Sequence, residues 1–221
     1  MSIGDFKGGT GYCPVDSPEA MLKTIKDLGF VPFFENPVSG YSIEEMTAEG
    51  CWFDDEEGEL GPWDWKIDVI QTGDIAYGKF LVGGKASFAT VDWYRELMAY
   101  RRSLDKCRPK GLDKEVYDAI AEARTISPAE LRKGFKLKKA QIDSILTRLE
   151  YDTLVVVGDI SRVYRGADLH YNGWQRSSVC TPDALFEISP STGPDPFGRL
   201  FSHVKGLFPD ATDAQVRKVI V

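Results

Sequence analysis

The segment Leu60-Gly61-Pro62-Trp63-Asp64-Trp65-Lys66 decides how this chain is interpreted. Two tryptophans enclose an aspartate and precede a lysine. If the segment is extended, the rings of Trp63 and Trp65 point to opposite faces, so at least one ring faces something other than the local core. Tryptophan combines a large apolar ring with an N–H donor. The segment is therefore either a functional site or a Trp-rich corner covered by the aliphatic stem of Lys66.

The residues after this segment favour β-structure. Strands are predicted at residues 67–70, 75–82 and 85–91. Gly83-Gly84 fits a two-residue hairpin turn between the last two strands. That register pairs Lys79 with Phe88 and places Tyr77 and Lys79 on one apolar face. Lys79 is then either an edge residue that reaches water or a charge kept for a partner.

Helices are predicted on both sides of this region. Asp16-Ser17-Pro18-Glu19 places proline in a first turn and lets Glu19 close a capping box on Asp16. Ser42-Ile43-Glu44-Glu45 is a second capping box. A further helix over residues 92–102 ends at Arg101-Arg102. These arginines either stabilise the helix dipole or contribute to a binding surface.

The second half of the chain has a clear order of elements. After a linker at residues 107–111, three helices are predicted, followed by a β-hairpin within residues 153–180. This is the order of a winged helix-turn-helix domain. The third helix and the basic turn before it carry side chains that can reach phosphates and base edges, namely Lys138, Lys139, Gln141, Ser144 and Arg148. The alternative is a winged helix that serves protein interaction or structure alone.

These patterns divide the chain into three parts. Residues 1–108 form an N-terminal α+β region with the W-x-W-K motif, and residues 109–188 form the winged helix-turn-helix domain. Residues 189–221 form a C-terminal helical extension that follows a Gly- and Pro-rich stretch.

Composition indicates a soluble globular protein, expected in the cytoplasm and without a membrane partner. The chain has 221 residues and is 43% hydrophobic, and it has no apolar run long enough to cross a bilayer. The net charge of −7 is unevenly distributed, since residues 16–68 hold 14 acids and 3 bases, whereas residues 79–148 hold 16 bases and 9 acids. The basic middle is the candidate surface for a polyanion, and the acidic run 54–59 is predicted to be a solvated loop.

Several kinds of site are not expected. Four scattered cysteines and two histidines do not favour a metal site or a disulfide framework. Gly8-Gly9-Thr10-Gly11 lacks the lysine and spacing of a phosphate loop, so neither a nucleotide nor another cofactor is expected. Asp64 and Asp68 remain candidate catalytic carboxylates, because aromatic walls can raise the pKa of a carboxyl and suit it to act as a general base.

Several motifs, taken in order, resemble the AlkZ-related bacterial proteins. They are Gly61-Pro62-Trp63-Asp64-Trp65-Lys66, Tyr77-Gly78-Lys79-Phe80, Lys85-Ala86-Ser87-Phe88, Trp93, Tyr100-Arg101-Arg102, Tyr171-Asn172-Gly173-Trp174 and Thr181-Pro182-Asp183. The likeness covers about residues 40–185 at compatible spacing.

The resemblance implies a fold and a partner. The AlkZ family proper consists of DNA glycosylases that are built from tandem winged-helix domains and act on alkylated or crosslinked bases. It implies that the helices before residue 50 and the hairpin at 67–90 form a first winged helix. The predicted fold is then α+β, with tandem winged helix-turn-helix domains and small antiparallel β-hairpin wings. DNA is the implied partner and DNA repair the implied process.

The motifs above do not include the family's catalytic motif. AlkZ-type enzymes place the attacking water with a Q-x-Q or Q-x-D motif. No Q-x-Q pair occurs here, and the one Q-x-D spacing, Gln141-Ile142-Asp143, lies in the third predicted helix of the second half, away from the W-x-W-K region. The glutamines are Gln71, Gln141, Gln175 and Gln215. The likeness therefore indicates the fold more than the reaction.

Three hypotheses follow. In the first, a DNA-binding cleft holds an extruded base between aromatic rings and cations, and it is lined by Trp63, Trp65, Lys66, Tyr77, Lys79, Arg101 and Arg102. If this protein is a glycosylase, Asp64 or Asp68 orients water. In the second, the chain is a transcriptional regulator whose Trp cluster is an effector pocket and whose helix 138–151 reads an operator. In the third, the W-x-W motif only holds a domain interface together.

Overall fold

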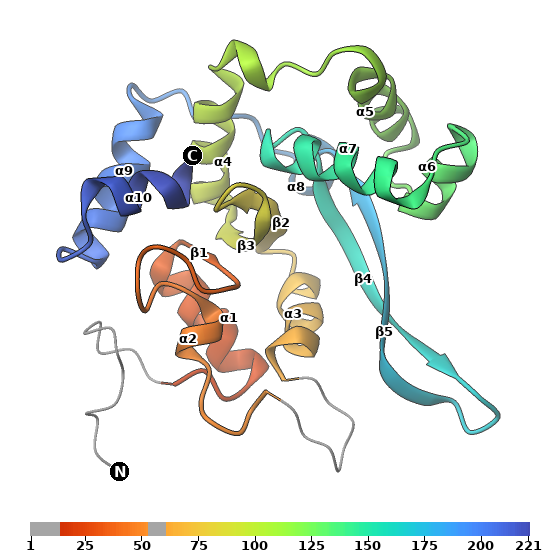
Figure 1. Cartoon of the computed structure of the whole chain (residues 1–221), viewed down its shortest axis with the longest axis horizontal. Coiled ribbons are helices and arrows are strands. Elements are labelled where there is room, and N and C mark those ends of the chain that lie inside the picture. Colours follow the sequence, from red (N-terminus) through yellow and green to blue (C-terminus); the bar gives the residue numbers. More distant parts are fainter. Residues whose placement is uncertain (1–13, 53–60) are drawn as a thin grey trace.

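The computed structural model describes residues 14–52 and 61–221, which form a mixed α and β structure (Figure 1). The helices are α1 (Pro18–Leu28), α2 (Ile43–Met46), α3 (Pro62–Gln71), α4 (Val91–Arg102), α5 (Gly111–Ala123), α6 (Pro128–Gly134), α7 (Lys139–Tyr151), α8 (Pro182–Phe186), α9 (Pro196–Leu207) and α10 (Asp213–Ile220), with a 3-10 turn at Asp105–Cys107. The strands are β1 (Phe30–Pro32), β2 (Ile75–Leu81), β3 (Lys85–Thr90), β4 (Val156–Arg165) and β5 (His170–Cys180). The predicted α+β class with small antiparallel sheets is confirmed. The acidic run 54–59 lies outside the described residues.

The N-terminal unit, α1 to α4 with β1 to β3, contains a three-stranded antiparallel sheet in the order β1-β3-β2. Its first helix begins one residue later than the sequence pattern suggested, because Ser17 rather than Asp16 caps it. The Ser17 hydroxyl accepts a hydrogen bond from the N–H of Ala20 at 3.2 Å. The predicted cap at Ser42 is confirmed, since its hydroxyl accepts from the N–H of Glu45 at 3.1 Å.

The strand prediction for residues 67–70 is wrong, because these residues form the second half of α3. Gly61 has a positive φ of 52° and Pro62 occupies the first turn, where proline's fixed φ suits a helix. A Cβ atom at Gly61 would lie 1.8 Å from the carbonyl oxygen of Cys51, so only glycine fits this start. On a helix, residues two apart still point in different directions. Trp65 accordingly enters the core, while Trp63 is half-buried on another side.

The predicted hairpin register is also wrong. The connection has three residues with positive φ, Val82, Gly83 and Gly84, and Leu81 pairs with Lys85 across it. The register shifts between Gly78 and Leu81. Tyr77 instead of Lys79 therefore lies opposite Phe88, with ring centroids 4.9 Å apart. Local turn composition fixed the place of the hairpin but not the length of its loop.

The second unit consists of α5, α6 and α7 with the long hairpin β4–β5. Ile126, between α5 and α6, forms an antiparallel bridge to Val179 on β5. The predicted capping box of α6 is confirmed, because Ser127 and Glu130 exchange both hydrogen bonds. The predicted inner stripe of α7 is also confirmed, and Ile142, Ile145, Leu146 and Leu149 are all buried.

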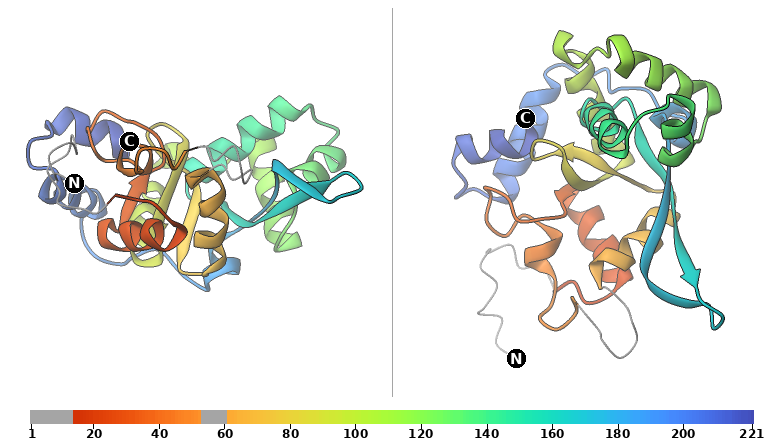
Figure 2. Two further views of the ribbon diagram at one scale, coloured as in Figure 1. Left: turned by 90° about the horizontal axis from the view of Figure 1, so that it is seen from below. Right: turned by 45° about the vertical axis from the view of Figure 1, so that its right-hand side comes forward.

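One hairpin contributes to both hydrophobic cores. Val156 and Ile160 of β4 belong to the core of the N-terminal unit, whereas Val179 of β5 belongs to the core of α5 to α7. The hairpin then runs past α3 of the N-terminal unit, and its tip projects beyond both units, as the two views of Figure 2 show. The two units are thus joined by shared packing as well as by the chain between them.

The C-terminal helices return to the N-terminal unit. Figure 1 shows α9 and α10 beside α4, far from the hairpin. Leu200 of α9 and Val216 of α10 are fully buried in the N-terminal core. In the described part of the chain, no helix is both long and apolar enough to cross a membrane.

The packing of α9 predicts a stability effect. Leu200 is 0% exposed, so Leu200→Ala leaves a cavity and should lower the free energy of unfolding by about 3 kcal/mol in a urea titration. Leu169, near the hairpin tip, is 68% exposed, and Leu169→Ala should change it by less than about 0.5 kcal/mol. Equal effects of the two substitutions would show that α9 does not share the N-terminal core.

Candidate functional site

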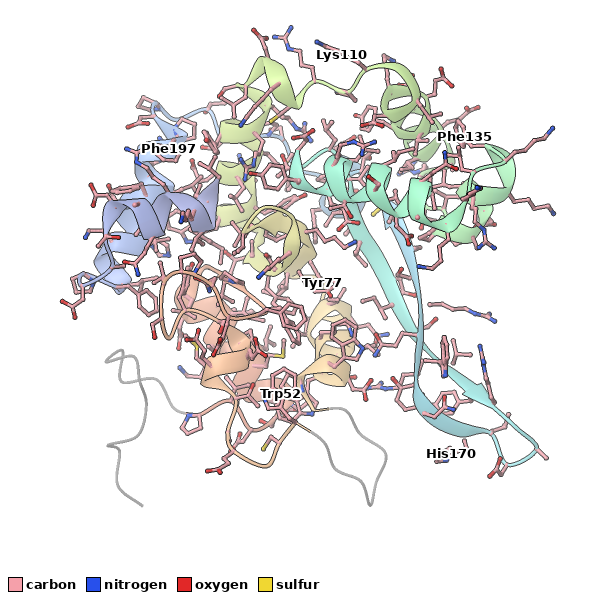
Figure 3. The ribbon with its side chains drawn as sticks, in the orientation of Figure 1. Trp52, Tyr77, Lys110, Phe135, His170 and Phe197 are labelled. Atoms are coloured by element: carbon pink, nitrogen blue, oxygen red, sulfur yellow. The ribbon has the colours of Figure 1, made fainter. Side chains whose placement is uncertain are left out.

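A cavity of about 620 Å³ lies between the two units. Its walls come from α3, β2 and β3 on one side and from α7, β4 and β5 on the other. The lining residues include Phe34, Trp63, Lys66, Tyr77, Gly78, Lys79, Lys85, Glu150, Ile160, Gln175 and Ser177. Figure 3 labels Tyr77, which lies near the middle of the molecule, and His170, near the far end of the hairpin. Four predicted site residues, Trp63, Lys66, Tyr77 and Lys79, thus meet around one cavity.

Lys66 is a buried cationic residue on this cavity, with only 2% of its surface exposed. Its Nζ donates to the carbonyl oxygen of Trp63 and, at 2.6 Å, to Oε1 of Gln175. It also lies 3.6 Å from the centroid of the Trp63 ring, a cation–π distance. The helical turn of α3 makes this possible, because residues 63 and 66 face the same side.

Gln175 connects the two units. Its Oε1 faces the Lys66 amine, and its Nε2 donates to Oδ1 of Asp64 at 2.9 Å and to the hydroxyl of Tyr171 at 3.2 Å. The Tyr171 hydroxyl donates in turn to Asp64. Asp64 is 1% exposed, so its carboxylate lies behind Gln175 as a buried support. The network holds β5 against α3 through the Gln175 amide. Its oxygen needs a hydrogen-bond donor and its nitrogen needs an acceptor, and α3 supplies both.

Burial lowers the pKa of Lys66 to about 7. The negative charge of Asp64 opposes this decrease, and the positive charge of Arg162 adds to it. Taking an ammonium ion out of water disfavours its charged form. Both the neutral and the charged amine are therefore populated near neutral pH.

Glu150 is a second buried titratable group on the same cavity. It lies on α7 and is 5% exposed, and its Oε2 accepts a hydrogen bond from the backbone N–H of Lys79 at 2.8 Å. Burial raises the pKa of its carboxyl to about 7, and Lys79 acts in the opposite direction through its charge and this hydrogen bond. A Cβ atom at Gly78 would lie 3.3 Å from Oε2, so the missing side chain makes room for the carboxyl.

Lys79 lies at the contact between the two units. Its Nζ donates to the hydroxyl of Thr147 on α7 at 3.0 Å. Together with the bond from its backbone N–H to Glu150, this contact holds α7 against β2. Lys79 therefore serves an internal contact in addition to lining the cavity.

A second cavity of about 500 Å³ adjoins the first. The two share the lining residues Pro128, Asp143 and Ser177. Three cationic side chains line the second cavity, namely Arg132, Lys139 and Arg176, and all three residues are exposed. An aromatic hollow therefore continues into a basic one.

The structure places the other predicted site residues away from the larger cavity. Arg101 is fully buried, where its Nη2 donates to the carbonyl oxygen of Ile220 and its guanidinium lies 4.0 Å from the Tyr151 ring. Arg102 donates to the carbonyl oxygen of Thr153 at 3.1 Å. Neither arginine lines either of the two cavities.

Asp68 and Arg148 have partners outside the larger cavity. Asp68 forms an ion pair with Arg162 of β4 at 3.1 Å. Arg148 donates to both carboxylate oxygens of Asp113 at 2.7 Å and, at the same distance, to the Ser144 hydroxyl. Asp113 lies in the first turn of α5, which begins at Gly111, and its carboxylate binds Arg148 of α7.

Exposed positions extend along α7 from its N-cap, Lys138, to Arg148. Lys138, Lys139, Gln141 and Ser144 are exposed. Lys139 pairs with Asp143 of its own helix at 2.7 Å. Gln141 returns its side chain to the N–H of Lys138, where it closes a cap.

Sequence reasoning missed three contributors to the site, Gln175, Tyr171 and Glu150. Gln175 was set aside because no second glutamine or aspartate stands two residues away, and its partners come from α3, more than a hundred positions earlier. Tyr171 was quoted only as part of a family pattern. Glu150 had a usable signal, since an acid directly after the buried Leu149 on a regular helix borders the apolar stripe.

No metal centre is formed by the described residues, since no three His, Cys, Asp or Glu side chains gather there. The two acidic residues that line the cavity, Asp143 and Glu150, are engaged with lysines. Asp143 pairs with Lys139 at 2.7 Å, and Glu150 accepts a hydrogen bond from the backbone N–H of Lys79. The groups at this site that could bind or react with a ligand are therefore an amine, a carboxyl group and aromatic rings.

A model of the AlkZ-related family matches residues 15–221 of this chain. The matched region spans both units and the C-terminal helices, whereas the motifs quoted from the sequence extend over only about residues 40–185. No curated protein and no solved structure matches the chain.

The raised pKa of Glu150 predicts a pH-dependent stability. Between its ordinary value of 4.5 and about 7, the folded protein holds the proton more tightly than the unfolded chain. This contribution is complete below pH 4.5 and is lost as the pH rises through 7. Glu150→Gln keeps the shape and does not ionise. Relative to the unchanged protein, its free energy of unfolding should rise between pH 5 and 8 by up to about 3 kcal/mol. A pH-independent difference would contradict a buried carboxyl that ionises with a raised pKa.

Proposed function

The chain belongs to the AlkZ-related family, and on that basis we propose that it binds DNA between its two units and acts in DNA repair. This family is related to DNA glycosylases. The single observation that supports a binding role here is the continuity of the aromatic cavity with a basic hollow on the same side of α7.

We propose that both units are winged helices. In the N-terminal unit the order is helix, strand, helix, helix, hairpin, and the sheet runs β1-β3-β2. In the second unit three helices precede a hairpin, and Ile126 bridges to β5, which pairs with β4. The same strand order therefore occurs twice, which supports tandem domains with the second at residues 109–188 and residues 189–221 as a C-terminal extension.

An extruded or unpaired base is the ligand that suits the larger cavity. Trp63 is half-buried on one wall, and Tyr77 lines the same cavity. Base stacking on aromatic rings is tolerant of sequence, and an enzyme that acts on a base takes it out of the stack. The adjoining cations, Arg132, Lys139 and Arg176, then hold the flanking phosphates.

The packing of the two candidate recognition helices favours this proposal over an operator-reading regulator. On α7, Thr147 accepts a hydrogen bond from Lys79, Tyr151 lies under Arg101, and the exposed Arg148 is paired with Asp113, so these side chains of its C-terminal half are engaged within the protein. On α3, most side chains are buried and Asp68 pairs with the hairpin. The arrangement suits a distorted site better than a long run of read base pairs.

We propose a positioning role for Asp64. Its Oδ1 accepts hydrogen bonds from both Gln175 and Tyr171, so the carboxylate fixes the amide that holds Lys66. Asp68, paired with Arg162, is proposed to hold α3 to β4. Neither carboxylate lines the larger cavity.

Binding of labelled DNA, followed by fluorescence anisotropy, tests the base-binding proposal. The unchanged protein should prefer a duplex with one unpaired base over a perfect duplex of the same sequence. Trp63→Ala should reduce this preference by about 5- to 100-fold, the value of one base–aromatic stack. Trp174→Ala removes an exposed hairpin tryptophan outside the cavity and should preserve the ratio. Tight binding to one perfect duplex, with no preference for the unpaired base, would instead support a transcriptional regulator.

The basic hollow predicts a salt dependence. Arg132→Ala and Lys139→Ala should each weaken binding to all sequences and reduce the slope of log K against log salt by about 1, because each removes one phosphate contact. Lys114→Ala is the matched control, since Lys114 is exposed on α5 and paired with Asp118. An unchanged slope for both variants would place the phosphates elsewhere on the protein.

A further inference from the structure

The DNA-binding role leaves the state of Lys66 unexplained. Phosphates are usually held by exposed, fully charged lysines, whereas Lys66 is 2% exposed and lies between an indole ring and an amide. Burying a cation costs free energy unless its charge is matched. Asp64, the nearest source of negative charge, directs Oδ1 to Gln175 and Tyr171. A buried amine of this kind is a candidate nucleophile.

The contacts of Lys66 suit a neutral amine. A neutral amine has two N–H groups and one lone pair, and the two acceptors that its Nζ contacts are the carbonyl oxygen of Trp63 and Oε1 of Gln175. These two bonds use both N–H groups. The residue lines the 620 Å³ cavity, so a ligand bound there lies against the Lys66 side chain. The pKa lowered to about 7 by burial agrees with this geometry.

We propose that Lys66 forms an imine with an aldehyde bound in the cavity, and that the aldehyde is the ring-opened sugar of an abasic site in DNA. The identity of the aldehyde rests on the proposed function. An abasic nucleotide lacks its base, so its sugar can enter a cavity that otherwise takes an extruded base.

The reaction balances without an added oxidant or reductant. The lone pair of Nζ attacks C1′ of the open-chain sugar, a C–N bond forms, and the carbonyl oxygen takes up a proton. The resulting carbinolamine then loses its hydroxyl group as water, and the C=N bond forms. The sum is amine plus aldehyde giving imine plus one water, and hydrolysis returns both.

Glu150 lines the same cavity, and in this proposal it supplies and recovers the proton. It is held by the N–H of Lys79, and its carboxyl has a pKa raised to about 7. Dehydration of a carbinolamine needs a proton on the leaving hydroxyl, so an acid that is half protonated near neutral pH suits this step. The amine and the acid come from different units, α3 and α7, and both residues line the cavity.

Reductive trapping tests the inference. The full-length protein is incubated at pH 7 with an oligonucleotide duplex that carries one abasic site, and borohydride is added to reduce the imine to a stable amine. A covalent protein–DNA adduct should form, and peptide mapping should place it at Lys66. Lys66→Arg and Lys66→Met should reduce the adduct at least about 100-fold, while Lys85→Arg, at an exposed lysine that lines the same cavity, should retain it. An adduct that maps to another lysine overturns the inference.

A small aldehyde separates the reactivity of the amine from DNA binding. With propionaldehyde and cyanoborohydride, Lys66 should be labelled at least about tenfold faster than exposed lysines at pH 7, since they are almost fully protonated there. Its rate should level off above about pH 8, whereas theirs continues to rise towards pH 10. A rate no faster than that of exposed lysines overturns the inference.

The outcomes distinguish this inference from the proposed function. If the abasic duplex binds in the anisotropy assay but gives no adduct at Lys66, the inference fails and the DNA-binding function stands. If the abasic duplex does not bind, the proposed function and the identity of the aldehyde fail together, and the small-aldehyde rates alone decide whether Lys66 is a reactive amine. Unfolding curves of Lys66→Met and Lys66→Arg establish that each variant is folded before its adduct is scored.

Discussion

The buried amine of Lys66 and its hydrogen bond to Gln175 constrain the rest of the site. The amine comes from α3, and the amide comes from β5, in the other unit. An unmatched buried donor or acceptor costs about 1–3 kcal/mol, so the two units must meet at a spacing that satisfies both groups. Asp64 and Tyr171 complete the network from the same two elements. This contact joins two walls of the cavity, since Lys66 and Gln175 both line it.

A second contact, between α7 and β2, joins the two units at another wall of the cavity. Glu150 and Thr147 of α7 accept hydrogen bonds from the backbone and side chain of Lys79. Both contacts place ionisable groups where water is scarce, and burial moves the pKa values of Lys66 and Glu150 towards neutrality from opposite sides. Burying these two groups costs folding free energy, and both of them change charge near neutral pH.

The shared hairpin explains how these contacts stay aligned. Val156 packs in one core and Val179 in the other, so β4 and β5 belong to both units at once. Gln175 and Tyr171 lie on the part of β5 beyond this shared base. Arg162 on β4 adds an ion pair to Asp68 of α3. Movement of one unit against the other would break several of these contacts together, which keeps the cavity walls in place.

Local sequence determined much of the fold. Proline positions, capping residues and apolar spacing predicted α1, α2, α4, α6, α7 and the two hairpins, because those signals act within a few residues. The family was also readable from ordered motifs, and the match to residues 15–221 confirms it. Among site residues, Trp63, Lys66, Tyr77 and Lys79 were identified and do share a cavity.

Tertiary structure decided the remainder. Residues 67–70 are apolar enough for a strand, yet the start at Gly61 and Pro62 and burial on several sides make them helical. Arg101 looked like a surface cation but is enclosed by α10, which follows it by more than a hundred residues. Gln175 carries no local mark of function, and the only local signal at Glu150 is its position beside the apolar stripe of α7. Their roles arise from partners distant in sequence, and burial, which sets the pKa values of Lys66 and Glu150, is a property of the packed chain alone.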